Sequence, residues 1–389
     1  MPLDPMLVAR AFDGDRLRQA RQLSMMTKQG LAQRLGVTAA AVSQYESGTI
    51  APRPDLIPLL AKALTVRPEF FTAGRPQARL EVGSAFFRSL RSTTARQRSR
   101  STAYTEQLWE LMSAIEEHVQ LPEVALPGFG GGEVRPGVLP QDPVAAAQAM
   151  RRLWGLGTDR IPHLVALIEA KGIVTTIVPN VEDEVARIGA FSTSALTRPI
   201  IVLSLSRGDD VLPYRFSAAH ELGHLVLHGE GATGDPLLER EADRFAAEFL
   251  TPRLAVGPQL PSRMDFRVLE RLSRQWGVSL ESLIVRSQEV GAISEATARR
   301  AFMRLNQLRD AGVFRPEPVA SHPGEVPSML RRAVELAETH GLSVRDLANQ
   351  LQWEPSYVRQ MLGTPDPRPA LRLMPSAEET TRGHDDGER

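Results

Sequence analysis

Cysteine is absent from the 389-residue sequence. A chain without thiols forms no disulfide, Cys-ligated zinc finger or iron–sulfur cluster, and it has no catalytic cysteine. Any transition-metal site must therefore be made of imidazole and carboxylate groups, and the sequence has only eight histidines. Histidines close together in sequence are consequently the first feature to look for.

An excess of charge of either sign is also missing, since 46 Lys and Arg residues balance 46 Asp and Glu residues. Overall charge therefore indicates neither a nucleic-acid nor a membrane partner, and any DNA binding must come from a local basic patch. No apolar run approaches the roughly 18 residues that a membrane span needs. The first 21 residues contain acids and lack the apolar core of a signal peptide. We expect a cytoplasmic protein without a membrane partner.

The distribution of helical, strand and turn signals predicts several domains, and at roughly 150 residues per domain the chain has room for two or three. We predict an all-α unit over 1–75 and a basic linker over 76–142, which contains a helix at 104–119. An α+β domain is predicted over 143–260, followed by helical segments over 261–312 and 320–363 and a disordered tail over 364–389. The α+β domain is expected to contain strands at 173–178, 188–191 and 200–205, arranged as a small antiparallel sheet, and helices at 213–228 and 237–250.

The strongest chemical signal is the pentapeptide His-Glu-Leu-Gly-His at 220–224, inside a predicted helix. His220 and His224 are one turn apart on one face, so both imidazoles can bind one ion, while Glu221 reaches a water on that ion. Zinc suits these ligands and lowers the pKa of its bound water to about 7, which makes Glu221 a candidate general base. The neighbouring residues are apolar, which favours a metal site over a structural histidine cluster.

A third protein ligand is expected on the next predicted helix. Glu239 and Asp243 are four residues apart and share one face, so one can bind the metal while the other orients a histidine through its second ring nitrogen. Glu241 is a competing ligand that spacing alone does not exclude. His228, one turn beyond His224, is interpreted as a rim or packing residue.

These two segments together, His-Glu-Leu-Gly-His and then Glu-x-x-x-Asp-x-Phe-Ala-Ala-x-x-Leu-x-Pro, resemble the ImmA/IrrE family of zinc metallopeptidases over about residues 143–310. The resemblance implies a zincin-like domain of the gluzincin type. It implies zinc bound by His220, His224 and Glu239, with Glu221 as the base and Asp243 at the family's Asn/Asp position. Family members cut helix-turn-helix repressors, so a repressor or antitoxin is the implied protein substrate, in a stress-response or toxin–antitoxin setting.

The first unit resembles the Cro/C1 (XRE-type) helix-turn-helix over residues 13–73, through Met26–Ala32, the turn Leu35–Thr38 and Val42–Gly48. The resemblance implies that the helix at 38–47 enters the major groove of double-stranded operator DNA, and that the protein is a homodimer. Residues 1–75 hold ten Lys and Arg against six Asp and Glu. The expected DNA contacts are Lys28, Gln29, Thr38, Ala39, Ala40, Ser43 and Gln44.

The predicted recognition helix departs from that family at its first positions. Ala39 and Ala40 stand where the family often has Gln, Ser or Thr, and alanine makes no side-chain hydrogen bond to a base. Lys28 occupies the place of a phosphate-contacting Gln, which favours backbone affinity. We therefore expect weak sequence discrimination with a strong salt dependence. A helical protein-interaction module that lost DNA specificity is the alternative.

Two later segments repeat the apolar spacing of this unit. Residues 343–358 align with 27–42, and residues 272–283 fit more loosely, which predicts helix-turn-helix-like C-terminal modules of shared architecture. Taken together, the patterns predict a DNA-binding transcriptional regulator that carries a zinc-dependent endopeptidase. The alternative is a non-proteolytic transcription factor or antitoxin-type regulator that uses the metallopeptidase fold for sensing or dimerisation.

Overall fold

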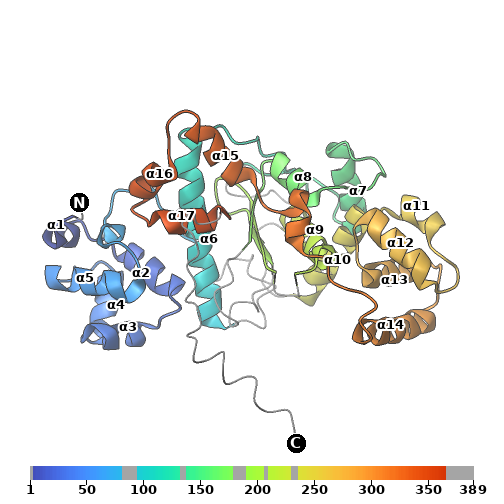
Figure 1. Cartoon of the computed structure of the whole chain (residues 1–389), viewed down its shortest axis with the longest axis horizontal. Coiled ribbons are helices and arrows are strands. Elements are labelled where there is room, and N and C mark those ends of the chain that lie inside the picture. The colour runs from blue at the N-terminus through green and yellow to red at the C-terminus, as the bar shows by residue number, and fades with distance from the viewer. Residues whose placement is uncertain are drawn as a thin grey trace, which may run out of the picture.

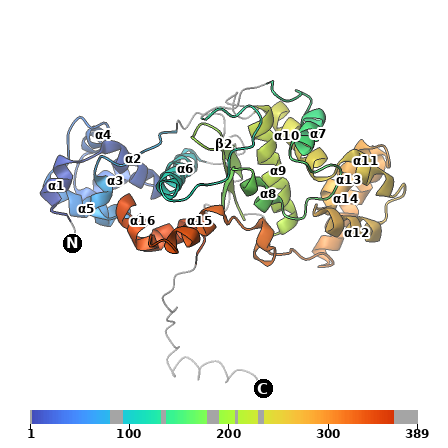
Figure 2. The same ribbon diagram turned by 90° about the horizontal axis from the view of Figure 1, so that it is seen from above.

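The computed structural model describes residues 3–80, 94–131, 137–177, 190–205, 209–228 and 235–364. The predicted tail beyond residue 364 and the central part of the predicted linker, 81–93, lie outside this description. The described chain is mostly helical, with one small sheet (Figure 1). The N-terminal helices lie at one end, helix α6 stands beside them, and the sheet and its helices follow. The last helices, α15–α17, return to α6 (Figure 1, Figure 2).

The N-terminal unit folds as the sequence predicts, into short helices separated by capped turns. Its helices are α1 Pro5–Arg10, α2 Gly14–Leu23, α3 Lys28–Leu35, α4 Ala39–Glu46 and α5 Ile57–Leu64, with 3₁₀ turns at Pro54–Leu56 and Pro68–Phe71. The hydroxyls of Thr27 and Thr38 accept hydrogen bonds from the backbone N–H groups of Gly30 and Ala41, so both residues cap the helices that follow them. Gly36 ends α3 at a φ of +66°, a left-handed conformation that favours glycine.

Helix α6, Ala95–Glu116, is the central element of the molecule and differs from the expected linker helix. It begins nine residues before the predicted start at 104, because Thr94 and Gln97 form a reciprocal capping box. Most of its residues from Ser101 to Ile115 are buried. It contacts α2 on one side and helices α15 and α16 on another, so this stretch is a core element and not an exposed connection.

The sheet has three strands, β1 Val174–Ile177, β2 Phe191–Thr193 and β3 Ile200–Leu203, in the order β1-β3-β2. The prediction of an antiparallel sheet is wrong for one pair: β2 and β3 are antiparallel, but β1 pairs in parallel with β3. The physical reason lies in the strand order, because β3 lies between β1 and β2. The 22 residues between β1 and β3, which include β2, are enough for the chain to return and pair with β1 in parallel. Part of the predicted strand 188–191 lies outside the described residues.

Two hydrophobic clusters cover the two faces of this sheet. Val174, Ile200 and Val202 belong to the cluster that includes α6 and the N-terminal unit, whereas Ile201 and Leu203 belong to the cluster of the later helices. The alternation follows from the two-residue period of a strand. The sheet is therefore a middle layer between α6 and the helices α8, Leu164–Ala170, and α9, Val211–Leu227.

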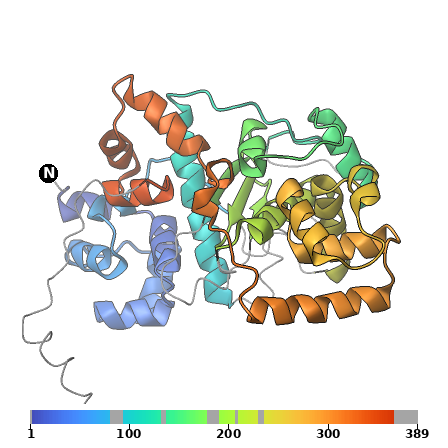
Figure 3. The same cartoon turned by 45° about the vertical axis from the view of Figure 1, so that its right-hand side comes forward.

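The remaining helices surround the second cluster and then lead back to the N-terminal unit. They are α7 Pro143–Leu153, α10 Pro236–Leu250, α11 Arg253–Val256, α12 Phe266–Trp276, α13 Leu280–Glu289 and α14 Glu295–Asp310, with 3₁₀ turns at Gly257–Gln259, Val319–Ser321 and Pro323–Glu325. The yellow and orange helices α11–α14 group at the end opposite the N-terminal unit (Figure 1, Figure 3). Helices α15 Met329–Glu338, α16 Val344–Leu351 and α17 Pro355–Met361 follow. No helix within the described residues is long and apolar enough to cross a membrane.

Candidate metal centre and nucleic-acid face

Helix α9 carries the His-Glu-Leu-Gly-His segment in its last two turns. Asp210 caps the helix by accepting the backbone N–H of Leu212. Leu222, Leu225 and Val226 are buried, and α9 packs against β2, β3, α7, α8 and α10. The helix is thus held on several sides, and its histidines have little freedom to move.

Gly223 lets helix α10 approach α9 closely. A Cβ atom at this position would lie 3.0 Å from Cδ1 of Phe245 and 3.3 Å from Cα of Ala242. Such contacts are tighter than ordinary packing, so the glycine inside the motif is explained by helix–helix contact. The close approach brings one face of α10, with Glu239 and Asp243, beside the histidines of α9.

Three side chains converge at this contact. The Nε2 atoms of His220 and His224 are 3.0 Å apart, and they lie 3.3 Å and 3.7 Å from the two carboxylate oxygens of Glu239. One ligand atom from each of the three residues falls within 4.8 Å of the other two. Asp243 Oδ1 is 2.8 Å from Nδ1 of His220, on the far side of that ring. The structure therefore brings together the residues that the sequence nominates as ligands, and places Asp243 behind one of them.

The electrostatics of the cluster favour a cation. Burial alone would lower the pKa of His220, but its hydrogen bonds to Asp243 and Glu239 and the charge of Glu221 raise that pKa to about 10. The closeness of the His220 and His224 rings holds the pKa of Glu239 well below its usual range. Glu239 Oε1 is buried and has no hydrogen-bond partner among the described residues. Two imidazoles, a carboxylate with an unpartnered buried oxygen and nearby negative charge form a donor set that fits zinc.

Glu221 lies beside this cluster and is held by a residue that the sequence analysis missed. It is buried, and burial raises the pKa of its carboxyl, an effect opposed by His224, by His220 and by a hydrogen bond from Ser192. The Ser192 hydroxyl on β2 donates to Glu221 Oε2 at 2.8 Å. No sequence signal marks Ser192, because its role depends on the packing of β2 against α9.

The competing candidate Glu241 lies elsewhere in the structure. Its carboxylate is 3.0 Å from Nε2 of His228, and neither residue belongs to the converging triad. His228 Nδ1 in turn lies 2.9 Å from Nδ1 of His224. The His228 side chain is only 4% exposed, so it occupies a packing position behind the second histidine.

The cluster opens onto a cavity of about 410 Å³. Its lining includes His220, Glu221, Glu239 and Asp243, together with residues of α9 and of the segment after β3: Ser204, Leu205, Asp209, Asp210, Pro213, Tyr214, Phe216 and Ser217. This volume is in the range of small-ligand and peptide side-chain sites. Glu221 and two of the three proposed ligands, His220 and Glu239, therefore face one common space.

The residues predicted to contact DNA lie on α3 and α4. Gln29, Thr38, Ala39, Ala40 and Gln44 are exposed, and Ser43 is half-buried. Lys28 lies on the same face, and its Nζ atom is 3.0 Å from the Ser43 hydroxyl and 3.4 Å from Glu46. The exposed part of this face is thus formed by small and uncharged side chains.

Comparison with known protein families identifies two regions of the chain. The helix-turn-helix family matches residues 17–71, and the IrrE N-terminal-like domain, a peptidase family, matches residues 169–288. A search of curated proteins found no match. The first matched region contains most of α2 and all of α3 to α5, and the second contains the sheet, α9 and α10.

The fused architecture predicted from the two sequence resemblances is confirmed. The N-terminal part is similar to DNA-binding transcriptional regulators of the XRE helix-turn-helix type. The central part is similar to metallopeptidases of the ImmA/IrrE type. The domain boundaries drawn around these regions, and the roles of single residues in them, stay predictions.

Proposed function

We propose that the protein is a DNA-binding regulator whose central domain is a zinc-dependent endopeptidase. The observation that carries the proposal is the convergence of His220, His224 and Glu239 beside a cavity that the buried residue Glu221 also lines. His220, His224 and Glu239 would hold the zinc ion. When bound, zinc would supply a Lewis acid that polarises a carbonyl group and lowers the pKa of water.

The chain's own residues supply positioning and proton transfer. Asp243 accepts the Nδ1–H of His220, which leaves Nε2 of that ring free to act as a ligand. Glu221 accepts a proton from the attacking water and delivers it to the leaving amine. Ser192 fixes the orientation of the Glu221 carboxylate through its hydrogen bond. The substrate is a polypeptide, and the sequence resemblance favours a helix-turn-helix repressor or an antitoxin.

The N-terminal unit binds double-stranded operator DNA through the exposed face of α3 and α4, with the protein acting as a homodimer. Thr38 and Gln44 are exposed there and carry polar groups for base edges, whereas Ala39 and Ala40 offer apolar contact only. Phosphate contacts therefore dominate the affinity, and sequence discrimination is weak.

Changing Glu221 to Gln tests the proteolytic function. The amide keeps the size of the side chain but accepts no proton, so cleavage of a panel of helix-turn-helix repressors should fall by about 10² to 10⁴-fold. Cleavage products are measured by mass spectrometry and zinc by elemental analysis of the same samples. Zinc content should stay near one ion per chain, because Glu221 is not one of the three proposed ligands.

Two further variants complete the test. Glu295→Gln, an exposed acid of α14, is the matched control and should cleave like wild type. The double variant His220→Ala, His224→Ala should lose zinc as well as cleavage. Absence of cleavage in the zinc-loaded wild type across the panel would favour the non-proteolytic regulator, and zinc retained by the double variant would remove the proposed ligand set.

A further inference from the structure

The chain between α14 and α15 runs back across the region that carries the candidate metal centre (Figure 1, Figure 3). Residues 317–328 of this connection, called here the connecting segment, lie outside the domain predicted at 143–260 and beyond the matched residues 169–288. The segment contains the 3₁₀ turns Val319–Ser321 and Pro323–Glu325, and the second of these contacts α8. Its hydrogen bonds join it to α8 and to the first part of α9, the helix that carries the metal motif.

The first contacts are made with the residues that begin α9. The backbone N–H of Val211 donates to the carbonyl oxygen of Glu317 at 2.8 Å, and the N–H of Val319 donates to Oδ1 of Asp209 at 3.0 Å. Asp209 has a φ of +49°, a left-handed conformation that residues other than glycine adopt only when the surrounding structure holds them there. Asp209 also lines the cavity beside the metal centre. The connecting segment therefore holds part of the wall of that cavity.

The second contact is a buried ion pair between α9 and the connecting segment. The side chains of Arg215 and Glu325 are 4% and 2% exposed, and the guanidinium donates to Oε1 of the carboxylate. The same guanidinium donates to the carbonyl oxygens of Ile161 and Gly277, at 2.6 Å and 2.9 Å. A Cβ atom at position 277 would lie 2.8 Å from Nε of Arg215, so the glycine leaves room for the guanidinium. Arg215, five residues before His220, is thus fixed by several acceptors.

Two buried carboxylates connect the segment to both ends of α8. Glu325 accepts hydrogen bonds from the backbone N–H groups of the first two residues of α8, at 2.9 Å and 3.2 Å. Glu169, near the end of α8, accepts hydrogen bonds from the backbone N–H groups of Ser328 and Met329, where α15 begins, each at 3.0 Å. Carboxylates stabilise helix N-termini in this way. The segment is therefore fixed on α8 at two points.

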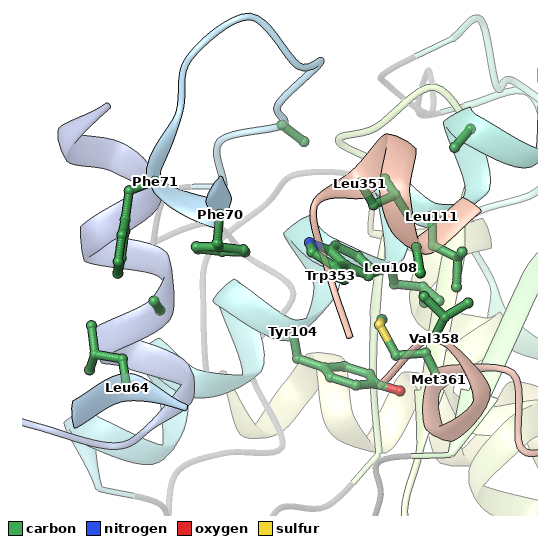
Figure 4. Packing of buried hydrophobic residues seen from close by; sticks show 14 of the residues in the cluster. Leu64, Phe70, Phe71, Tyr104, Leu108, Leu111, Leu351, Trp353, Val358 and Met361 are labelled. Atoms are coloured by element: carbon green, nitrogen blue, oxygen red, sulfur yellow. The ribbon is translucent and has the colours of Figure 1, made fainter. Parts of the chain in front are cut away.

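Beyond the connecting segment the chain is fixed on α6. Helices α15 and α16 contact α6, and α15 also contacts β1. Figure 4 shows Leu351 and Val358 of the last helices beside Leu108 and Leu111 of α6, in the hydrophobic cluster that includes the N-terminal unit. The segment is consequently held by packed helices after it as well as by α8 and α9, and it has little freedom to move away from α9.

We propose that the connecting segment is a positioning element of the peptidase. Val319 and Glu325 hold Asp209 and Arg215 in place, and with them the cavity wall along the first half of α9. Neither Val319 nor Glu325 lines the cavity or belongs to the ligand triad, so both act through the residues that they hold. The inference rests on the proposed peptidase function, and it adds residues about 100 positions after the metal motif to the unit that binds the substrate.

Val319→Pro tests the contact with Asp209. Proline has no N–H group, and it fits the first position of a 3₁₀ turn after an extended residue, so the variant removes the donor with little change in the backbone. Loss of this hydrogen bond should raise the KM of repressor cleavage about threefold to tenfold and leave kcat within about twofold. Val319→Ala is the matched control, because it removes side-chain atoms but keeps the N–H group, and its KM should equal that of wild type.

Hydrogen exchange followed by mass spectrometry reads the same contact without any substrate. The amides of residues 209–217 should exchange about threefold to tenfold faster in Val319→Pro than in wild type. Asp209→Gly removes the acceptor and should have the same effect, and the double variant should exchange no faster than either single variant, because both remove one bond. Asp209→Asn keeps a side-chain oxygen for the Val319 N–H group and should exchange like wild type.

Glu325→Gln provides a stronger perturbation, since it leaves the Arg215 guanidinium without its counter-charge and should raise KM by at least about tenfold. Circular dichroism and urea midpoints establish that each variant is folded, and if Glu325→Gln does not fold, the Val319→Pro measurements decide. Unchanged exchange in Val319→Pro, or faster exchange with an unchanged KM, overturns the proposal. Absence of cleavage by zinc-loaded wild type would instead refute the proposed function, and the exchange measurements would still show whether the segment holds Asp209.

Discussion

The candidate metal centre and the proposed DNA-binding face, on α3 and α4 of the N-terminal unit, are assembled in different ways. The metal centre takes His220 and His224 from α9, Glu239 from α10 and Ser192 from β2, and its groups are largely buried. The proposed DNA-binding face comes from two short consecutive helices, α3 and α4, and its residues are largely exposed. One site depends on tertiary packing, and the other depends mainly on local capping.

This difference indicates where each region is sensitive to change. A local site tolerates changes elsewhere in the chain as long as its own helices form. A convergent site needs the packing of every element that contributes to it, because displacements of about 1 Å are enough to impair catalysis. The N-terminal unit is nevertheless not independent of the rest, since α2 packs on the buried helix α6.

The largest expected effect comes from the contact between α2 and α6. Arg16 and Glu110 form an ion pair with both side chains 1% exposed, and Arg16 also donates to the carbonyl oxygens of Arg75 and Pro76. Arg16→Met leaves the Glu110 carboxylate buried without its partner, so the free energy of unfolding should fall by about 3–5 kcal/mol. Urea denaturation followed by circular dichroism measures the change.

Two companion variants make this result specific. Arg53→Met breaks an ion pair with Asp55 whose side chains are 76% and 65% exposed, and it should change stability by less than about 0.5 kcal/mol. The double variant Arg16→Met, Glu110→Leu removes both charges and should recover much of the loss. Equal stability of Arg16→Met and Arg53→Met would show that the N-terminal unit does not depend on α6.

A smaller effect is expected from the convergent site. Ser192→Ala removes the hydroxyl that orients Glu221 and should lower the rate of repressor cleavage by about 10- to 100-fold, the range of a hydrogen bond to a charged group. Zinc content should not change, because the hydroxyl of Ser192 bonds to Glu221, which is not a proposed ligand. Ser194→Ala is the matched control: its hydroxyl is also buried but has no hydrogen-bond partner among the described residues. Similar rates for both variants would remove Ser192 from the site.

The smallest effect is expected on the proposed DNA-binding face. Lys28 is already paired with Ser43 and Glu46, so Lys28→Ala should weaken binding to an operator fragment by less than about threefold and leave the salt slope almost unchanged. Lys62→Ala, an exposed lysine of α5, is the matched charge control. Fluorescence anisotropy over a salt series measures both. A tenfold loss of DNA affinity, together with a salt slope that is smaller by about one, would show that Lys28 leaves Ser43 and Glu46 to bind a phosphate.

Sequence reasoning was most successful where the signal is local. The helix 237–250 and the spacing of His220 and His224 follow from neighbouring residues, and the structure has them nearly as expected. Sequence reasoning was less successful for α6, because the arginine-rich start of this segment resembles a solvated linker. No local signal shows that Glu110 and Glu106 form ion pairs with Arg16 and Arg18, which are far away in the sequence. The prediction of the strand pairing was also wrong for β1. The direction of its pairing depends on the order of the strands in the sheet, which the sequence does not show.

The sequence by itself determined the classes of chemistry that this protein can carry. Without cysteine, a metal site had to use histidine and carboxylate, and the i, i+4 spacing determined which two histidines share a helix face. Only the tertiary structure decided that Glu239 and not Glu241 lies beside both histidines, and placed Ser192 against Glu221. The physical reason is the sequence distance over which each interaction acts. Helical periodicity and capping involve residues a few positions apart, whereas these contacts join elements that meet only when the hydrophobic clusters pack.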